Sequence, residues 1–125
     1  MNVEKFLPKH YEEICGWWKA HDWTPVSLDA LPCTGVIVPG VCAGFLYSTD
    51  SSMCILEWII SNPKVDSGLR SEGLDIVIDE LLKKAHSSGY KTVFTSVSHP
   101  KLLERYCDFG FKKADFNMTN LLKVL

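Results

Sequence analysis

The chain has 125 residues, of which 46% are hydrophobic and 22% are charged, and its formal net charge is −2. This length and composition suit one globular domain, so we expect residues 1–125 to form a single unit. The charge balance argues against a surface built for a nucleic-acid backbone. No apolar run approaches the ~20 residues of a membrane helix. We therefore expect neither nucleic acid nor a membrane as a partner.

The chain contains five cysteines, an odd number without a Cys-x-x-Cys pair. This pattern indicates free thiols in a reducing compartment. The charged N-terminal sequence MNVEKFLPKHYEE is unlike a signal peptide. The histidines and cysteines lack the spacing of metal ligands. We expect a cytoplasmic protein without a bound metal.

The first quarter of the chain predicts a strand, a helix and a loop. Residues 3–7 are a candidate short strand. Apolar side chains at helical spacing, beginning with Tyr11, predict an amphipathic helix over residues 9–20. The segment 21–32 contains two prolines and predicts a loop with at most one helical turn.

The middle of the chain predicts a three-stranded meander. The β-rich runs 35–38 and 41–47 flank Pro39-Gly40, which suits a hairpin turn. A polar turn then leads to a third strand at residues 54–60.

The second half of the chain alternates helices with strands. An unbroken apolar stripe from Leu74 to Ala85 is the strongest helix signal in the sequence. Residues 91–98 predict a strand, Pro100 begins another helix, and residues from Phe116 onward predict a last strand. The order β-α-α-β-β-β-α-β-α-β predicts a mixed α/β sheet with helices on both faces.

Three local sequences carry a family resemblance. In chain order they are ILEWIISNP at residues 55–63, SGYK at 88–91 after the long helix, and YCDFGF at 106–111. They resemble the fourth strand, the turn into the fifth strand, and the Tyr-x-x-x-Gly-Phe of the GNAT (GCN5-related N-acetyltransferase) superfamily. The tryptophan-rich start and LEWIISNP resemble a short GNAT-like subfamily often encoded by bacteriophages.

The resemblance implies a mostly antiparallel GNAT-like sheet and an activity. The activity is an N-acetyltransferase that moves an acetyl group from acetyl-CoA, as co-substrate, to an amine acceptor. Tyr106 takes the position of the general acid that protonates the departing thiolate, and Glu57 is the candidate base. The alternatives are a core tyrosine at 106 and, for Glu57, an exposed carboxylate opposite Trp58.

The resemblance also implies the residues that hold the CoA thioester. Backbone groups of Ile59, Ile60 and Ser61 would pair with the pantetheine, in a gap between the strands at 54–60 and 91–98. The pyrophosphate would bind at the start of the central helix, where free N–H groups and the helix dipole favour anions. The other positions implied as cofactor contacts are Arg70, Ser71, Gly73 and His99.

The loop before the central helix departs from the family's Gln/Arg-x-x-Gly-x-Gly/Ala. The nearest string is RSEGLD at residues 70–75, where Asp75 replaces the final small residue and Glu72 adds negative charge. Nearby carboxylates can cancel the ~0.3–1 kcal/mol that a helix N-terminus gives to an anion. A non-catalytic GNAT-like binding module with a degenerate CoA loop is therefore the alternative function.

The acceptor side of the site is suggested by aromatic residues. Tyr11, Trp17 and Trp23 are candidates for an acceptor pocket beside the loop 24–32. An aromatic stripe on a helix is also typical of a core. For His99, a helix cap or a solvent-facing side chain is the alternative to a cofactor contact. The sequence names no acceptor, and a homodimer stays open.

Overall fold

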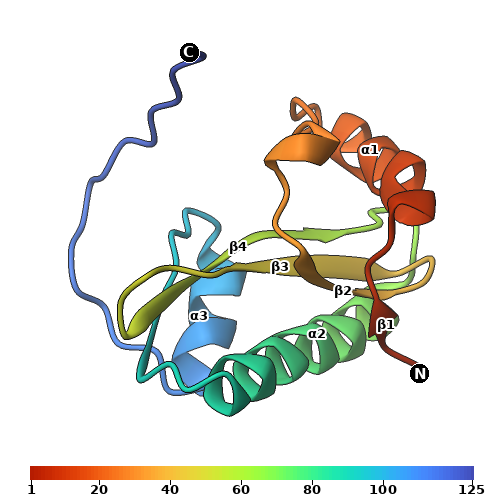
Figure 1. Cartoon of the computed structure of the whole chain (residues 1–125). Helices are drawn as coiled ribbons and strands as arrows, with labels where there is room; N and C mark the ends of the chain where they lie inside the picture. The colour runs from red at the N-terminus through yellow and green to blue at the C-terminus, as the bar shows by residue number, and fades with distance from the viewer.

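The computed structural model describes all 125 residues and contains one five-stranded sheet with helices on both faces (Figure 1). The strand order is β1-β2-β3-β4-β5, and all neighbours are antiparallel except the parallel pair β4 and β5. This confirms the predicted mixed, mostly antiparallel sheet. None of the helices has both the length and the apolar composition of a membrane span. The elements are β1 (Glu4–Lys5), η1 (Pro8–His10), α1 (Tyr11–Ala20), η2 (Leu28–Ala30), β2 (Thr34–Val38), β3 (Cys42–Tyr47), β4 (Met53–Ser61), α2 (Ser67–Ser87), β5 (Thr92–Phe94) and α3 (Pro100–Asp108).

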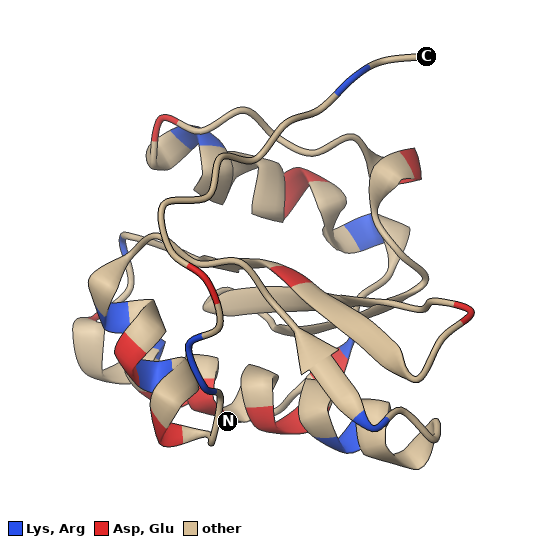
Figure 2. Ribbon diagram, turned by 90° about the vertical axis from the view of Figure 1, so that its left-hand side faces the viewer, with Lys and Arg blue, Asp and Glu red and all other residues tan.

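Two apolar cores lie on opposite faces of the sheet. On one face, α2 and α3 cover the strands, and the predicted stripe from Leu74 to Ala85 supplies the buried side of α2. On the other face, Ile14, Trp17 and Trp18 of α1 pack against the sheet. Charged residues of both signs lie mainly on the helices and their connections (Figure 2). Each helix therefore buries one stripe and leaves its charged side in solvent.

The predicted hairpin joins β2 to β3. The N–H of Val41 donates to the carbonyl of Val38 at 2.9 Å. Gly40 has φ +79°, a left-handed conformation that glycine adopts without strain. The N–H of Gly40 also donates to Glu13 Oε1 at 2.7 Å, so this turn is fixed to α1.

A β-bulge interrupts β4 at its centre. Ala43 of β3 pairs with Ile60, but Phe45, two residues on, pairs with Glu57, three residues back. The strand β4 therefore holds one extra residue at this point. Trp58 has φ +60°, which is rare for a bulky residue and indicates local strain.

The bulge changes the face that the rest of β4 presents. Leu56 lies in the core under α2, whereas Ile60 lies in the core under α1. In a regular strand these two side chains would share a face. Gly44 of β3 makes room for the bulge, because a Cβ there would lie 2.5 Å from Ile59 Cδ1.

The strands β4 and β5 diverge, as the sequence predicts. Their pairing ends at Ile55 and Phe94, whereas β4 continues to Ser61. Strand β5 is also shorter than the predicted 91–98, since it comprises only Thr92–Phe94. A stretch of β4 is left without a neighbouring strand on this side.

The last strand predicted from Phe116 onward is wrong. Residues 112–125 contain no helix or strand and take part in no hydrogen bond of the structure. Figure 1 shows this segment leaving the body of the molecule. Its apolar residues favour β-structure, but an extended chain becomes a strand only where another strand pairs with its backbone groups.

All five cysteines are free thiols, as predicted. Burial raises the pKa of Cys42 to about 12 and also raises the pKa of Cys54. Both thiols are therefore protonated core groups and poor nucleophiles.

Candidate active site

A cavity of about 250 Å³ lies where β4 and the chain after β5 diverge. Its walls come from α1 and the following loop, the bulged part of β4, residues 95–99, and α3. The fold thus brings together residues that are distant in sequence. The predicted site residues that line the cavity are Trp23, Glu57, Ile59, His99 and Tyr106.

Tyr106 is both a core residue and a cavity residue. Its side chain belongs to the core under α2 and is 2% exposed, yet it also lines the cavity. The pKa of Tyr106 is raised to about 12, chiefly by burial; a hydrogen bond with Thr95 opposes this shift, and the charge of Glu57 adds to it. The phenol therefore keeps its proton at physiological pH and can act as a donor.

Gly110 and Phe111, which follow Tyr106 in the motif, hold the tyrosine in place. The helix α3 ends before Gly110, whose φ of +95° turns the chain back. The N–H of Phe111 then donates to the carbonyl of Tyr106 at 3.0 Å, and the two ring centroids lie 5.0 Å apart. The motif thus fixes the tyrosine ring at the end of the helix.

Glu57 bridges the two diverging chains. Its Oε1 accepts a hydrogen bond from the N–H of Ser96 at 2.7 Å, while Thr95 Oγ1 donates to the carbonyl of Leu56 at 2.7 Å. Burial raises the pKa of Glu57, and hydrogen bonds from Ser96 and Thr95 partly oppose the shift. The carboxyl is half-buried and shares the cavity with Trp58. The two side chains meet there because the bulge breaks the alternation of β4.

The strained residue Trp58 is held by a polar contact. Its Nε1–H donates to the hydroxyl of Tyr47 at 2.8 Å, and the Tyr47 hydroxyl donates to the carbonyl of Ala30 at 2.7 Å. These bonds tie the bulge to the connection before β2. A left-handed residue in mid-strand persists only where its surroundings fix it, and such positions concentrate at functional sites.

The loop after α1 closes one side of the cavity and is anchored by three contacts. The hydroxyl of Tyr11 donates to the carbonyl of Val26 at 2.6 Å. His21 Nε2 donates to the carbonyl of Ser61 at 3.1 Å, because a carbonyl can only accept. The His21 ring stacks on Trp23, which is 51% exposed. Tyr11 therefore positions the wall without lining it, and one backbone group of Ser61 is already paired.

Of the two tryptophans of α1, Trp18 lines the cavity and Trp17 does not. Trp17 is 5% exposed and packs in the core around Phe45 and Ile60, away from the cavity. Trp18, which was not predicted as a site residue, lines the cavity. Trp17 and Trp18 follow Ile14 by three and four residues, so both lie on the inner face of α1, and helical spacing alone does not tell which of them reaches the cavity.

His99 occupies the N-cap position of α3. Its carbonyl accepts from the N–H of Leu103 at 3.0 Å, but its side chain makes no capping bond. The residue is exposed and lines the cavity. Its imidazole is therefore free to meet a ligand at the rim.

The central helix begins earlier than the resemblance implies. Helix α2 starts at Ser67, and Asp66 is its N-cap. The Asp66 carboxylate accepts from the N–H groups of Gly68 at 3.0 Å and Leu69 at 3.4 Å. An acid of the chain itself thus occupies the position where a helix N-terminus binds an anion.

Arg70 and Gly73 lie within the first two turns of α2. A Cβ on Gly73 would stand 2.8 Å from Val41 Cγ1 and 2.9 Å from Cys42 Sγ. The glycine is therefore needed for close packing of α2 on the start of β3. Arg70 is half-buried, and its Nε is buried without a hydrogen-bond partner.

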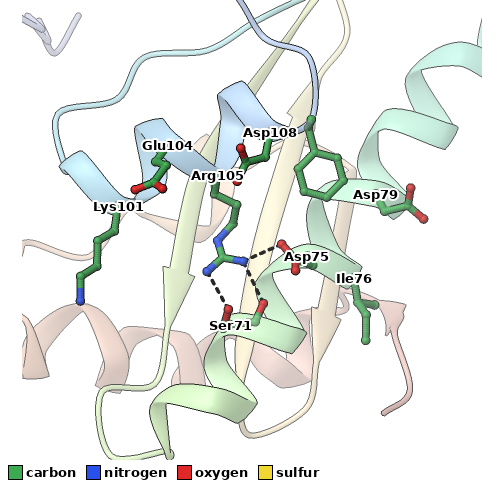
Figure 3. Close-up of a pocket in the computed structure, with 9 residues that line it drawn as sticks. Ser71, Asp75, Ile76, Asp79, Lys101, Glu104, Arg105 and Asp108 are labelled. Atoms are coloured by element: carbon green, nitrogen blue, oxygen red, sulfur yellow. Dashed lines mark hydrogen bonds and ion pairs between the residues drawn. The ribbon is translucent and has the colours of Figure 1, made fainter.

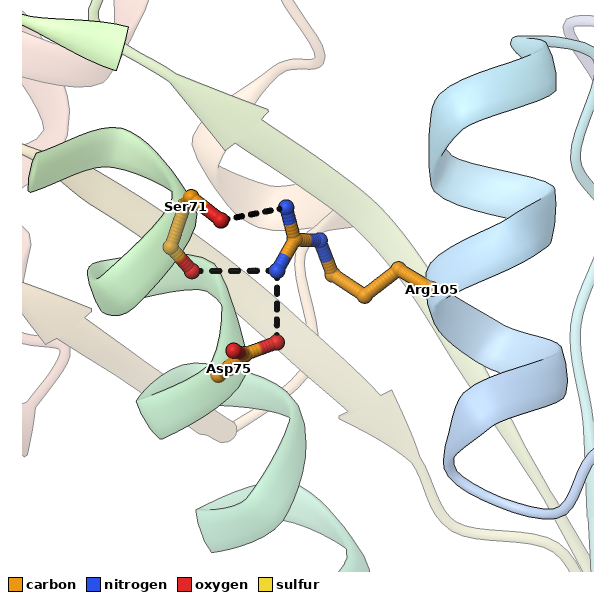
Figure 4. A network of polar contacts seen from close by, with 3 residues as sticks. All are labelled: Ser71, Asp75 and Arg105. Carbon is orange, nitrogen blue, oxygen red and sulfur yellow. Dashed lines mark hydrogen bonds and ion pairs between the residues drawn. The ribbon is translucent and has the colours of Figure 1, made fainter. Parts of the chain in front are cut away.

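Ser71 belongs to a polar network between α2 and α3 (Figure 4). Arg105 Nη1 donates to the carbonyl of Ser71 at 3.0 Å and to Asp75 Oδ1 at 2.5 Å. Arg105 Nη2 donates to Ser71 Oγ at 3.0 Å. The charge of Asp75, which the sequence suggests is adverse to CoA, is therefore countered by an arginine of α3.

The network lies in a groove of about 850 Å³ between α2 and α3 (Figure 3). Four carboxylates face two basic side chains along this groove, so its surface favours no anion. The charged residues that line it are Asp75, Asp79, Lys101, Glu104, Arg105 and Asp108.

No protein-family model and no curated protein sequence matches the chain. Solved structures match it along nearly its whole length. An acetyltransferase of Trypanosoma brucei has a TM-score of 0.71 at 15% identity, covering 97% of this chain and 99% of that one. A GNAT-family acetyltransferase of Streptococcus pneumoniae has a TM-score of 0.64 at 16% identity, covering 95% and 97%. Glucosamine-6-phosphate N-acetyltransferase of Arabidopsis thaliana has a TM-score of 0.63 at 13% identity, covering 98% of each. The chain therefore has the fold of GNAT acetyltransferases.

Proposed function

We propose that this chain is an N-acetyltransferase that moves an acetyl group from acetyl-CoA to an amine. The observation that carries the proposal is the cavity between β4 and the chain after β5, which is lined by a buried Tyr106 and a half-buried Glu57. Acetyl transfer needs a base for the amine and an acid for the leaving thiolate. The raised pKa values of both groups suit those two roles.

In the proposed reaction, Glu57 accepts the proton that the amine loses as its nitrogen bonds to the acetyl carbon. Tyr106 donates its proton to the sulfur as the carbon–sulfur bond breaks. Glu57 and Tyr106 line the same cavity. A proton passing from Glu57 to the phenolate returns both groups to their starting states.

The bulge supports the same proposal. It displaces one residue of β4 from the ladder, beside the cavity, at the strained Trp58. A backbone N–H released from the ladder there can bind the thioester oxygen as negative charge develops on it. Donors fixed in this way contribute about 2.7–4 kcal/mol to catalysis in well-studied acyl transfer.

The residues fit the reactive end of CoA better than its phosphates. On the unpaired side of β4, Ile59 lines the cavity and Ile60 follows it, so their backbone groups can serve pantetheine amides, whereas the carbonyl of Ser61 already bonds to His21; His99 lies at the rim. At the start of α2, by contrast, the carboxylate of Asp66 fills the anion position. Lys64 and Arg70 are the basic residues near this end in sequence.

The acceptor is proposed to be an amine with an apolar body. Three tryptophans, Trp18, Trp23 and Trp58, line the same cavity as Glu57. Flat apolar walls favour an apolar or aromatic group beside the amine.

The acid at the start of α2 favours a second candidate function. If Asp66 keeps its two hydrogen bonds, CoA phosphates are excluded from the helix end, and the domain is a non-catalytic binding module.

The decisive test is thiol release from acetyl-CoA with a panel of aromatic and aliphatic amines. Tyr106→Phe should lower the rate about 10²–10⁴-fold. Tyr90→Phe is the matched control, since that phenol bonds to Thr49. Equal background rates, with no binding of acetyl-CoA, would support the module.

A further inference from the structure

The cavity that contains Glu57 has the electrostatic character of a cation site. The ionisable side chains that line it are Glu57, His99 and Tyr106, and no lysine or arginine does so. Because Tyr106 keeps its proton, the carboxylate of Glu57 is the one negative charge of the wall. Glu57 is half-buried and forms no ion pair with another residue of the chain. A cation in the cavity therefore gives this carboxylate a partner, whereas an anion is repelled.

The same cavity is lined by three tryptophans, Trp18, Trp23 and Trp58. The face of an indole ring attracts a cation that lies within about 6 Å of the ring centre, more strongly than the other aromatic side chains do. Several aromatic rings around one pocket are a common means of binding ammonium groups that carry apolar substituents. A wall of indoles that also contains a carboxylate therefore suits an organic cation.

The turn after α1 joins two of these tryptophans. The N–H of Trp23 donates to the carbonyl of Trp18 at 2.9 Å, and the N–H of Asp22 donates to the carbonyl of Lys19 at 2.9 Å. These two bonds form a Schellman motif, in which Asp22 takes the left-handed position with φ +60°. The motif brings together the residues at the positions of Trp18 and Trp23. The end of the helix thus sets where both indoles stand.

The left-handed aspartate in this motif is unusual within the chain. Helices α2 and α3 end in the same motif, and there the left-handed residues are Gly89 and Gly110. Glycine adopts this conformation without strain, whereas an aspartate adopts it at a cost. The other left-handed residues that are not glycine are Trp58 and Asn117. Two of these three positions therefore fix tryptophans of one cavity, and local strain of this kind is typical of ligand-binding sites.

We propose that Trp18, Trp23, Trp58 and Glu57 bind an alkylated ammonium group. The inference deepens the proposed function and rests on it in one respect, that the acceptor occupies this cavity. The nitrogen that attacks the thioester must be neutral, so the charge that the indoles hold belongs to another group of the acceptor. A fully alkylated nitrogen has no N–H groups to satisfy, so indole faces can hold it without hydrogen bonds. The acceptor is an amine that also carries a quaternary ammonium group.

Binding measured without acetyl-CoA tests the cation site by itself. The probes are choline and dimethylbutanol, its neutral isostere, in which a carbon atom replaces the quaternary nitrogen. Calorimetry at matched ionic strength should show that choline binds roughly tenfold or more tightly than dimethylbutanol, from the strength of cation–π contacts in desolvated sites. Equal affinities of the two probes, or no binding of choline, would overturn the inference.

Two variants with one control locate the cation. Trp23→Leu keeps an apolar side chain and removes the indole face, and the 51% exposure of Trp23 lets the variant fold. It should weaken choline binding roughly two- to thirty-fold and leave dimethylbutanol binding unchanged. Glu57→Gln should likewise weaken choline alone, because it removes the negative charge. Phe94→Leu is the matched control, since Phe94 is 47% exposed and lies outside the cavity. If Trp23→Leu and Phe94→Leu bind choline alike, the inference is wrong.

Transfer assays separate this inference from the proposed function. Thiol release from acetyl-CoA is compared for a propylamine that carries a trimethylammonium group and for the same amine with a tert-butyl group in that place. The charged amine should have a KM roughly tenfold or more lower, with a similar kcat, because the cation is held equally before and during the reaction. Equal KM values for both amines would keep the proposed function and overturn the cation site. Tight binding of choline with no release from any amine would keep the cation site and overturn the acetyltransferase.

Discussion

The carboxylate of Glu57 accepts a hydrogen bond from the N–H of Ser96 at 2.7 Å, just beyond the last paired residues of β4 and β5. The bond holds the two chains at the mouth of the gap between them. The same carboxylate is the proposed base, and it has a second oxygen for the amine. Its structural and chemical roles are therefore separable by a substitution that keeps the shape and removes the basicity.

Glu57→Gln is that substitution. The amide oxygen can still accept from Ser96, so the temperature of unfolding should change little. The rate of acetyl transfer should fall about 10²–10⁴-fold, because the amine loses its base. The pKa of Tyr106 should also fall but stay raised, since burial is the main cause of its increase and the charge of Glu57 is a smaller one. Ultraviolet titration of the phenol measures this shift. An unchanged rate would leave Glu57 with its structural role alone.

The pH dependence of the rate follows from the raised pKa of Glu57. The base acts only when it is ionised, so the acid limb of kcat should lie above pH 4.5, the ordinary value for this group. Tyr106 stays protonated until about pH 12, so it adds no alkaline limb near neutrality.

The folded state also binds the Glu57 proton more tightly than the unfolded state does. That contribution to stability is present below pH 4.5 and is lost as the pH rises through the raised pKa.

If the acid limb of the pH–rate profile is the same in Glu57→Gln as in the unmodified protein, the limb reports the titration of another group. The comparison needs only rates measured from pH 4 to pH 9, in buffers of matched ionic strength, with both proteins folded over that range.

Asp66→Asn should tighten CoA binding. Asparagine caps a helix as well as aspartate does, so α2 should keep its start. Removing the negative charge from the anion position should strengthen binding roughly two- to five-fold, from the ~0.3–1 kcal/mol scale of helix-end charges. Calorimetry with CoA measures the change, and Asp50→Asn is a control with the same loss of charge in a distant turn. If the two variants bind alike, the phosphates lie elsewhere.

Gly44→Ala should destabilise the bulge. The added methyl group would lie 2.5 Å from Ile59 Cδ1 and 2.9 Å from Val77 Cγ1. Overpacking of this kind costs about 1–3 kcal/mol. Gly16→Ala is the matched control: it has nothing within 4 Å, lies in α1 and should stabilise by ~0.4–1 kcal/mol. Urea unfolding measures both, and equal effects would show that β4 has room to shift.

The parts of the fold that sequence predicts well are those with a strong local signal. The stripe from Leu74 to Ala85 gives α2 its buried face, and Pro39-Gly40 gives the first hairpin. The resemblance places the start of the central helix near Arg70, whereas the helix begins at Ser67 with Asp66 as its N-cap. The segment from Phe116 has the right pattern for a strand, but pairing depends on a partner that no local pattern supplies.

The candidate site is predictable only in part, because one residue of β4 changes its geometry. The resemblance identifies Tyr106 and Glu57, and the structure places both at one cavity. Nothing in the residues of β4 marks the bulge at Trp58, since the glycine that permits it, Gly44, lies on the neighbouring strand. Without the bulge, alternation puts Glu57 and Trp58 on opposite faces.

Arg105 and Tyr106 are consecutive residues of α3, yet they serve different places. Arg105 grips the second turn of α2 through Ser71 and Asp75, while Tyr106 lines the cavity beside β4. A short helix of nine residues moves as a rigid rod, so the two side chains are mechanically linked. Any ligand that competes with Arg105 for Ser71 would loosen the hold of α2 on α3 and let the phenol shift at the far wall. The position of the proposed proton donor, Tyr106, thus depends on the hydrogen bonds that Arg105 makes to α2.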